Sequence, residues 1–569
     1  MDLQRSLLIG AIAVLSFMLL TKWVDFKDSK VAPQVQESGR LLAANDSDMP
    51  AAPAQRTSAD SQGDTEDLPE LAANELPKQA SPGASAQSTG RVIQVYTDVL
   101  QLAIDLEGGD IIELDLPAFP ARIDTPDVPY VLLEDNDTRI YIAQSGLIGP
   151  DGIDRNGRAS YTTTSSIYKL EEGADSLVID LNWQNDQGIE VIKRFTFKRG
   201  DYLIQVDYLI ENGSESRWQA NLFGQLKRDN SPAPSSGASG GMGISPFLGA
   251  AITQPDDHFT KITFKDMKED PFKATLPGGW IAMIQHYFLS AWIPNPDQQH
   301  TYSTRVTGSD FNIAGFTSPA VVLDPGQRGE TGARFYGGPK DQYRLREISP
   351  YLDLSVDYGW LWWIAQPLFW LLTKIHALVG NWGVAIILLT VLIKAVFFKL
   401  SATSYRSMAN MRRVQPKMQD IREQYADDKQ KQSQAMMDLY RKEKINPMGG
   451  CLPILVQMPV FISLYWVLME SVELRQAPFV LWIKDLSVMD PYFVLPLLMG
   501  ASMFFMQKLN PPPPDPMQAK IMQWMPVIFT FFFLWFPAGL VLYWVVNNLL
   551  SMAQQYVITR QIEGQASKP

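Results

Sequence analysis

The sequence predicts a polytopic α-helical membrane protein of six spans that carries a large antiparallel β-sandwich domain. Six long apolar segments occur, one at the N-terminus and five after residue 380, and a period-two alternation of apolar and polar residues fills much of 91–350. Residues 1–350 hold 30 Lys+Arg against 47 Asp+Glu, a balance of −17, whereas 351–569 hold 19 against 14, a balance of +5. An acidic first half and a basic, apolar second half argue against a nucleic-acid-binding protein.

The N-terminal segment is expected to be an uncleaved transmembrane anchor, residues 1–24. Its apolar run follows Arg5 and lacks the small-residue cleavage pattern of a signal peptide. Residues 25–90 are rich in Ala, Ser, Asp, Gln and Pro and poor in large apolar residues. Such a composition cannot offset the entropy of ordering, so this stretch is predicted to be a flexible tether.

Residues 91–350 are predicted to form the sandwich. Leu100, Leu102 and Ile104 alternate with Gln101, Ala103 and Asp105, and two glycines at 108 and 109 then separate them from a second alternating run. The same pattern recurs at 177–183, 189–197 and 202–210, while the Gly/Ser/Pro-rich stretch 231–243 is predicted to be a surface loop.

Residues 351–380 are predicted to contain an amphipathic helix in the membrane interface. The segment is aromatic and apolar but carries Pro367, Lys374 and His376, and a seventh span is the alternative. The second span follows at 381–400. Four more are expected within 451–559, at 451–470, 492–507, 521–536 and 538–556.

The loop 401–450 sets the orientation because it holds ten Lys and Arg residues. The positive-inside rule places it in the cytoplasm, which puts the sandwich on the outer side and both termini, including the short tail 560–569, inside. Its apolar residues repeat at steps of three and four, which predicts a helical hairpin. Met411, Met418 and Met437 either fill its core or form an adaptable surface for varied partners.

Lys394 lies inside the apolar segment 381–400, and no Asp or Glu lies at matching depth in another span. An unpaired ammonium in hydrocarbon costs about 2.5–3.5 kcal/mol on insertion scales, so it must reach the headgroups or face water inside the protein. Snorkelling to the interface is the simpler alternative. Thr390 lies one turn further in on the same face of this span, and polar residues lie at similar depth in the other spans: Gln457, Ser502, Thr530, Asn547 and Asn548. Together they favour a hydrated groove open to the cytoplasm. Ordinary hydrogen bonds between packed helices would also explain them one by one.

No cofactor or metal site is predicted. Cys451 is the only cysteine, the four histidines lack metal-ligand spacing, and no GxxxxGK[ST] motif occurs. Asp256, Asp257 and His258 are titratable neighbours in the sandwich, but adjacency in sequence does not make a catalytic pocket. We therefore do not expect an enzyme.

Several motifs resemble those of the YidC/Oxa/Alb family of membrane protein insertases from Gram-negative bacteria. The similarity lies in an Asn-Pro…Gly-Gly-Cys…Gln-Met-Pro pattern and in two further runs, at residues 446–465, 473–479 and 529–548. It extends over the whole chain and implies a five-helix insertase core. Lys394 aligns with the basic groove residue of the family, usually Arg, which suggests that charge matters more than a bidentate fork.

The resemblance also implies that Thr390, Gln457 and Met458 line the substrate groove, with Trp544 where relatives often carry Tyr. The implied partners are nascent inner-membrane proteins, the Sec translocon with its accessory subunits, the ribosome and membrane lipids, with no direct contact to nucleic acid. A solute transporter would show internal repeats and midplane carboxylates, and neither is present. A membrane-anchored mutarotase-like enzyme would leave five spans unexplained.

Overall fold

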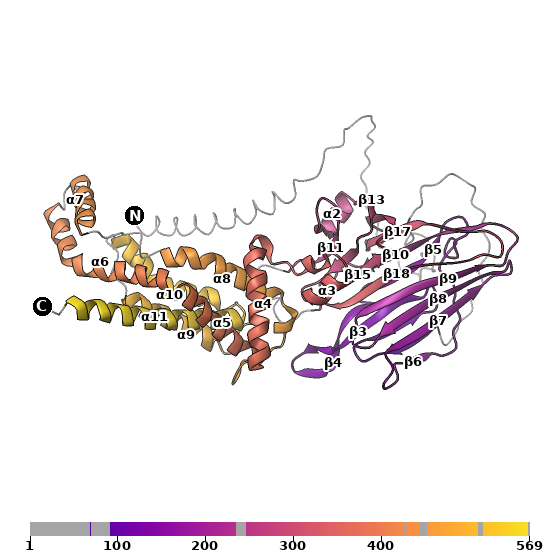
Figure 1. The fold of residues 1–569 in the computed structure, drawn as a ribbon, viewed down its shortest axis with the longest axis horizontal. Coiled ribbons are helices and arrows are strands. Elements are labelled where there is room, and N and C mark those ends of the chain that lie inside the picture. The colour runs from indigo at the N-terminus through magenta and orange to yellow at the C-terminus, as the bar shows by residue number, and fades with distance from the viewer. Residues whose placement is uncertain are drawn as a thin grey trace, which may run out of the picture.

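The computed structural model describes residues 69, 91–234, 246–425, 428–443, 452–509 and 516–566. The expected anchor 1–24, the tether 25–90 apart from residue 69, most of the 231–243 loop and residues 567–569 of the tail lie outside this part. The described chain is elongated, with a β-rich domain at one end and a group of helices at the other (Figure 1).

Two sheets form the β-rich domain. The first has ten strands in the order β13-β16-β17-β10-β5-β4-β3-β2-β1-β6. Their bounds are β1 Val92–Tyr96, β2 Gln101–Asp105, β3 Asp110–Arg122, β4 Thr125–Asn136, β5 Arg139–Ile148, β6 Ile167–Lys169, β10 Trp218–Arg228, β13 Lys273–Pro277, β16 Gln299–Val306 and β17 Asn312–Leu323.

The second sheet has eight strands in the order β12-β11-β14-β15-β18-β9-β8-β7. Their bounds are β7 Ser176–Gln184, β8 Ile189–Lys198, β9 Leu203–Asn212, β11 Gly249–Ile252, β12 Thr260–Thr263, β14 Ile281–Ile284, β15 Phe288–Pro294 and β18 Arg328–Pro339. Two short helices, α2 (Phe264–Glu269) and α3 (Gln342–Ile348), complete the domain.

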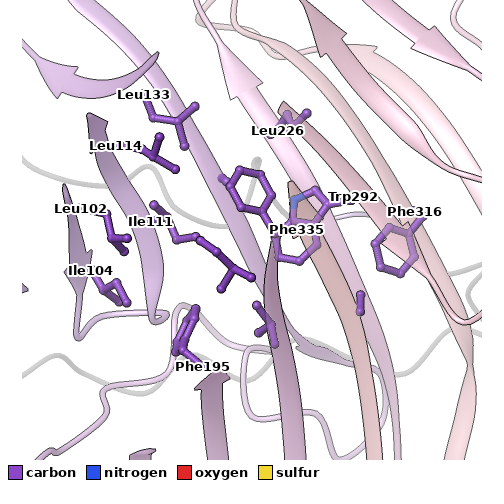
Figure 2. Close-up of a cluster of buried hydrophobic side chains, with 14 of the residues drawn as sticks. Leu102, Ile104, Ile111, Leu114, Leu133, Phe195, Leu226, Trp292, Phe316 and Phe335 are labelled. Atoms are coloured by element: carbon purple, nitrogen blue, oxygen red, sulfur yellow. The ribbon is translucent and has the colours of Figure 1, made fainter. Parts of the chain in front are cut away.

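The predicted antiparallel β-rich domain is confirmed, because the named strand pairs are antiparallel except β1 with β6. The alternating residues Leu102 and Ile104 are buried as expected, and Figure 2 shows them in the same cluster of buried side chains as Phe195 and Trp292. Gly108 and Gly109 turn the chain between β2 and β3 with φ of 82° and 63°, a region that glycine enters without strain.

Helices make up the rest of the described chain. They include the short 3₁₀ turns η1 (Leu352–Ser355), η2 (Gly359–Leu361) and η4 (Val472–Leu474). The α-helices are α4 Trp362–Val379, α5 Trp382–Val396, α6 Phe398–Gln424, α7 Lys429–Lys442, α8 Leu452–Glu470, α9 Val494–Leu509, α10 Pro516–Phe533 and α11 Ala538–Ala566.

Helix α4 lies crosswise at the end of the helical group that faces the β-rich domain, while α6 and α7 lie at the far end (Figure 1). Ala365, Phe369 and Leu372 form its buried face, which packs against α5 and α8. The opposite face is also apolar, since Trp363 and Trp370 are 60% and 53% exposed. This helix therefore offers apolar side chains on both sides.

The segment expected to be one span at 381–400 is broken. Helix α5 ends at Val396 and α6 begins at Phe398 at an angle of 68°. The sequence offers no glycine or proline at this point, and Gln554 of α11 donates to the Phe398 carbonyl beside the break at 3.1 Å. Within the described residues no single helix is both long and apolar enough to cross a bilayer; α5 and the first part of α6 meet that requirement only together.

Candidate functional site

Lys394 lies in the last turn of α5 and is only 7% exposed. Its ammonium donates a hydrogen bond to Ser551 Oγ of α11 at 2.7 Å. Ser551 in turn donates to the Asn547 carbonyl at 2.7 Å, one turn earlier in the same helix. The cation is therefore held between two helices by a neutral hydroxyl.

No carboxylate in the described part of the chain lies within ion-pair distance of Lys394. Ion pairs elsewhere in that part join residues of the β-rich domain, the hairpin or the junction beside α4. A buried cation whose charge is not neutralised by a neighbour attracts negative groups from a partner more strongly than it would in water.

The polar chain continues from Lys394 to a third helix. The Gln457 side chain on α8 donates to Asn547 Oδ1 at 3.2 Å, and Asn547 also receives the Ser551 bond on its backbone carbonyl. The groups Lys394, Ser551, Asn547 and Gln457 thus link α5, α11 and α8 in one row, which we call the polar row.

Asn548 is not part of the polar row. It is the next residue after Asn547 on α11, so its side chain points to a different side of the helix. It donates to Ser502 Oγ of α9 at 2.9 Å, and Ser502 donates to the Met499 carbonyl at 2.7 Å. The set predicted to share one groove is therefore divided: Ser502 joins α9 to α11 and makes no hydrogen bond to the polar row among the described residues.

The two threonines bond within their own helices. Thr390, 1% exposed, donates to the Ile386 carbonyl at 2.7 Å, and Thr530 donates to the Pro526 carbonyl at 2.7 Å. Thr530 also faces Gly500, where an added Cβ would clash with its hydroxyl. Thr390 remains one turn from Lys394 on the same helix, whereas Thr530 serves the close approach of α10 to α9.

Met458 and Trp544 occupy different environments. Met458 on α8 is 48% exposed. Trp544 on α11 packs edge-to-face on Phe461 at 4.6 Å between ring centroids and lies 5.5 Å from the Phe533 ring. Its buried indole Nε1 has no hydrogen-bond partner in the described part of the chain. Trp544 therefore acts as an aromatic wall rather than as a member of the polar row.

Helices α6 and α7 form the predicted hairpin, and Lys417 pairs with Glu443 across it at 2.6 Å. Met418, 5% exposed, and the partly buried Met411 pack with Val414 and Tyr440 in its core. Met437 is 56% exposed. Of the three methionines predicted either to fill the core or to form an adaptable surface for partners, Met411 and Met418 fill the core and Met437 lies on the surface.

Sequence reasoning missed Ser551 and Tyr405. Tyr405 of α6 lies against the Ser551 hydroxyl and is 9% exposed. Ser551 is four residues after Asn547, so the helical period alone places it on the same face. Tyr405 gave no signal because its approach depends on the bend at Phe397.

The titratable neighbours in the β-rich domain have local partners. His258 stacks on Tyr351 with ring centroids 3.8 Å apart, and Asp257 accepts a hydrogen bond from Thr260 Oγ1 at 2.8 Å. In the described ranges no three His, Cys, Asp or Glu side chains gather as a metal site would require. These side chains do not converge on a pocket.

Comparison with known proteins covers nearly the whole described chain. Residues 92–371 match the family model described as YidC periplasmic domain, and residues 374–565 match the one described as 60Kd inner membrane protein. "Membrane protein insertase YidC" of Stutzerimonas stutzeri (strain A1501) is 54% identical over 570 residues, covering 100% of both chains. The protein of the same name from Ectopseudomonas mendocina (strain ymp) is 51% identical over 592 residues, also covering 100% of both. A crystal structure of an active YidC insertase with the first transmembrane domain resolved is similar at a TM-score of 0.37 and 20% identity, covering 83% of this chain and 93% of that chain.

Proposed function

Because this chain belongs to the YidC family of membrane protein insertases, we propose that it inserts newly made proteins into the inner membrane and assists their folding there. The observation that carries the proposal is the polar row. In it the buried cation Lys394 donates to a hydroxyl, and no carboxylate of a described residue pairs with it.

In this mechanism Lys394 lies in a hydrated groove that opens to the cytoplasm. The ammonium attracts acidic groups in the short segment of a client that must reach the outer side. Water and the amides of Gln457 and Asn547 then replace part of that segment's hydration shell. The client's polar segment therefore has a thinner apolar layer to cross.

The client helix next moves along α8 and α10 into lipid. Apolar side chains suited to this path are exposed on both helices, including Met458, Trp524, Val527, Ile528 and Phe531. Transfer of the client's own apolar surface releases about 25 cal/mol per Å². The membrane potential adds about 2.3 kcal/mol per charge for each 100 mV when negative charge moves outward. No nucleotide hydrolysis is required.

The proposed topology has six spans, both termini in the cytoplasm and the β-rich domain in the periplasm. It is supported by the opposite placement of the α6–α7 hairpin and the β-rich domain (Figure 1) and by the match of residues 92–371 to a periplasmic domain. The hairpin receives clients through its exposed surface, of which Met437 is part. The Sec translocon with its accessory subunits, the ribosome and membrane lipids are the proposed partners.

Labelling with a charged, membrane-impermeant maleimide tests whether Lys394 faces water. Cys451→Ser removes the only cysteine, and Lys394→Cys or Leu392→Cys then introduces one. Leu392 is the control because it is 43% exposed, more than Lys394, yet lies on the apolar side of α5. Maleimide reacts with the thiolate, which forms readily only where water solvates it.

In inside-out vesicles we expect the cysteine at 394 to react much faster than the cysteine at 392. Equal, slow reaction at both positions contradicts a hydrated groove and with it this mechanism.

A further inference from the structure

The segment between η4 and α9 ends in an apolar tip. Leu481 is 84% exposed and Val480 is 49% exposed, in a chain where most large apolar side chains are covered. Leu481 also has φ of 56°, the left-handed region that residues with a Cβ rarely adopt. The chain therefore accepts backbone strain and apolar exposure at the same residue.

This tip is built into the fold on one side by α5. Asn381 Nδ2 donates to the carbonyls of Pro478 at 3.3 Å and Phe479 at 3.1 Å. The Phe479 ring occupies the space that a side chain at Gly383 would need. The start of α5 thus grips the tip directly.

The rest of the segment is also fixed. Phe479 N–H donates to the Ile483 carbonyl at 3.0 Å, which closes the tip into a tight loop. Trp482 Nε1 donates to the buried Asp490 carboxylate at 2.9 Å, and the Ala538 N–H of α11 donates to the Val488 carbonyl at 2.7 Å. Leu481 is therefore presented outward by a braced loop.

Exposed apolar side chains also lie at the end of α4, close in sequence to the residue that contacts the tip. Asn381, which grips the tip, follows α4 by two residues, and Leu378 and Val379 in its last turn are 87% and 37% exposed. Trp370 lies two turns earlier on the same outward face and is 53% exposed. We call Leu378, Val379, Val480 and Leu481 the apolar edge.

Two exposed lysines border the apolar edge. Lys374 lies one turn before Leu378 on α4, and Lys484 follows Leu481 by three residues. Neither forms an ion pair with a described residue. Exposed apolar side chains with ammonium groups beside them suit the interface of a bilayer, where the apolar groups can enter the acyl chains and the ammonium groups can reach the phosphates.

We propose that the apolar edge enters the outer leaflet of the inner membrane and that Lys374 and Lys484 bind the phosphate groups of anionic phospholipids there. This inference rests on the membrane placement in the proposed function. It gives the tip a role of its own, because Leu481 then helps to set the depth of the helical group in the membrane from the end of α5 opposite to Lys394.

Fluorescence quenching in vesicles of phosphatidylethanolamine and phosphatidylglycerol tests the proposal on the full chain. In the Cys451→Ser background, Leu481→Cys carries a small environment-sensitive fluorophore. Nitroxide lipids quench it from the bilayer and iodide quenches it from water. Val178→Cys is the matched control, because Val178 is an apolar residue of the β-rich domain that is 49% exposed. Trp370→Cys reports the placement of α4.

We expect nitroxide lipids to quench position 481 several-fold more than position 178, and iodide to do the reverse. If nitroxide lipids quench position 370 but not position 481, the inference is overturned and the proposed function still stands. This holds whether iodide quenches position 481 or protein shields that position from both quenchers. Failure of lipid quenching at both 370 and 481 contradicts the membrane placement itself.

Discussion

The ammonium of Lys340 donates to Glu470 Oε2 at 2.7 Å, and both side chains are buried. Lys340 directly follows β18, whereas Glu470 is the last residue of α8, so this ion pair joins the β-rich domain to the helical group. Lys340 also donates to the Ser355 carbonyl at 3.2 Å. The domain is thus attached through a desolvated contact as well as through the chain.

The Lys340–Glu470 pair predicts non-additive mutations. Lys340→Met or Glu470→Leu alone leaves one buried charge unpaired, and each is expected to lower the free energy of unfolding by about 3–5 kcal/mol. The double variant should lose much less, because two apolar side chains can pack together. Thermal unfolding of the full chain in detergent measures both. Lys261→Gln, which breaks the more exposed Lys261–Asp357 pair, is the control and should cost about 1 kcal/mol or less. Equal losses in the single and double variants contradict this prediction.

His286 predicts acid sensitivity of the same junction. It bonds to the Met469 carbonyl through Nε2 at 2.7 Å, and burial, aided by the Lys340 charge, lowers its pKa from 6.5 to about 3. Between pH 6.5 and 3 the His286 imidazole is therefore protonated in the unfolded chain and neutral in the folded chain. Stability falls as the pH drops through this window, by about 2 kcal/mol at pH 5 relative to pH 7.5.

His286→Gln should remove this part of the pH dependence of the unfolding free energy. An identical pH profile in the wild type and His286→Gln would show that His286 is not responsible.

Lys394 predicts an ordered series in client insertion. Lys394→Arg keeps the charge and should retain most activity toward a single-span client with an acidic outer segment. Lys394→Gln should reduce insertion, and Lys394→Glu should abolish it because it repels the client's charge. Protease protection of the client in proteoliposomes measures insertion. Lys399→Glu is the control, since Lys399 is exposed beyond the bend. Equal activity of the three Lys394 variants removes charge from the mechanism.

Ser551 predicts a milder effect through Lys394. Ser551→Ala removes the acceptor at 2.7 Å and leaves the ammonium under-satisfied, at a cost of about 1–3 kcal/mol. We expect slower insertion of acidic clients with little change for clients that lack acidic residues. Ser463→Ala, which removes a buried hydroxyl bonded to its own helix at the Pro459 carbonyl, is the matched control. Equal slowing for both client types indicates a merely structural role.

Gly500 predicts a steric coupling between α9 and α10. Gly500→Ala places a methyl group against the Thr530 hydroxyl and is expected to destabilise the protein by about 1–3 kcal/mol. Adding Thr530→Ala should recover much of that loss in thermal unfolding, because it removes the atom in the way. A double variant no more stable than Gly500→Ala places the strain elsewhere.

Local patterns predicted the strands well. The alternation at 177–183, 189–197 and 202–210 corresponds to β7, β8 and β9, because each strand has one face in the core and one face turned outward. The polar contact of Lys394 was also predictable from sequence, since a cation in an apolar segment demands a polar partner.

What the sequence left open depends on contacts between distant residues. Lys394 reaches Ser551 across 157 positions and Lys340 reaches Glu470 across 130, and no local period encodes such a pairing. The break at Phe397 lacks the usual glycine or proline signal. A contact from a distant helix lies beside it instead, the hydrogen bond from Gln554 of α11 to the Phe398 carbonyl.

Helices α5 and α6 meet at Phe397 at an angle of 68°, and the candidate site lies directly beside this bend. Lys394 lies three residues before Phe397 and Phe398 one residue after it. Helix α11 forms a hydrogen bond on each side of the bend, through Ser551 to Lys394 and through Gln554 to Phe398. Any displacement of α11 would therefore be felt on both sides of the bend, at the turn that carries the Lys394 ammonium and at the start of α6.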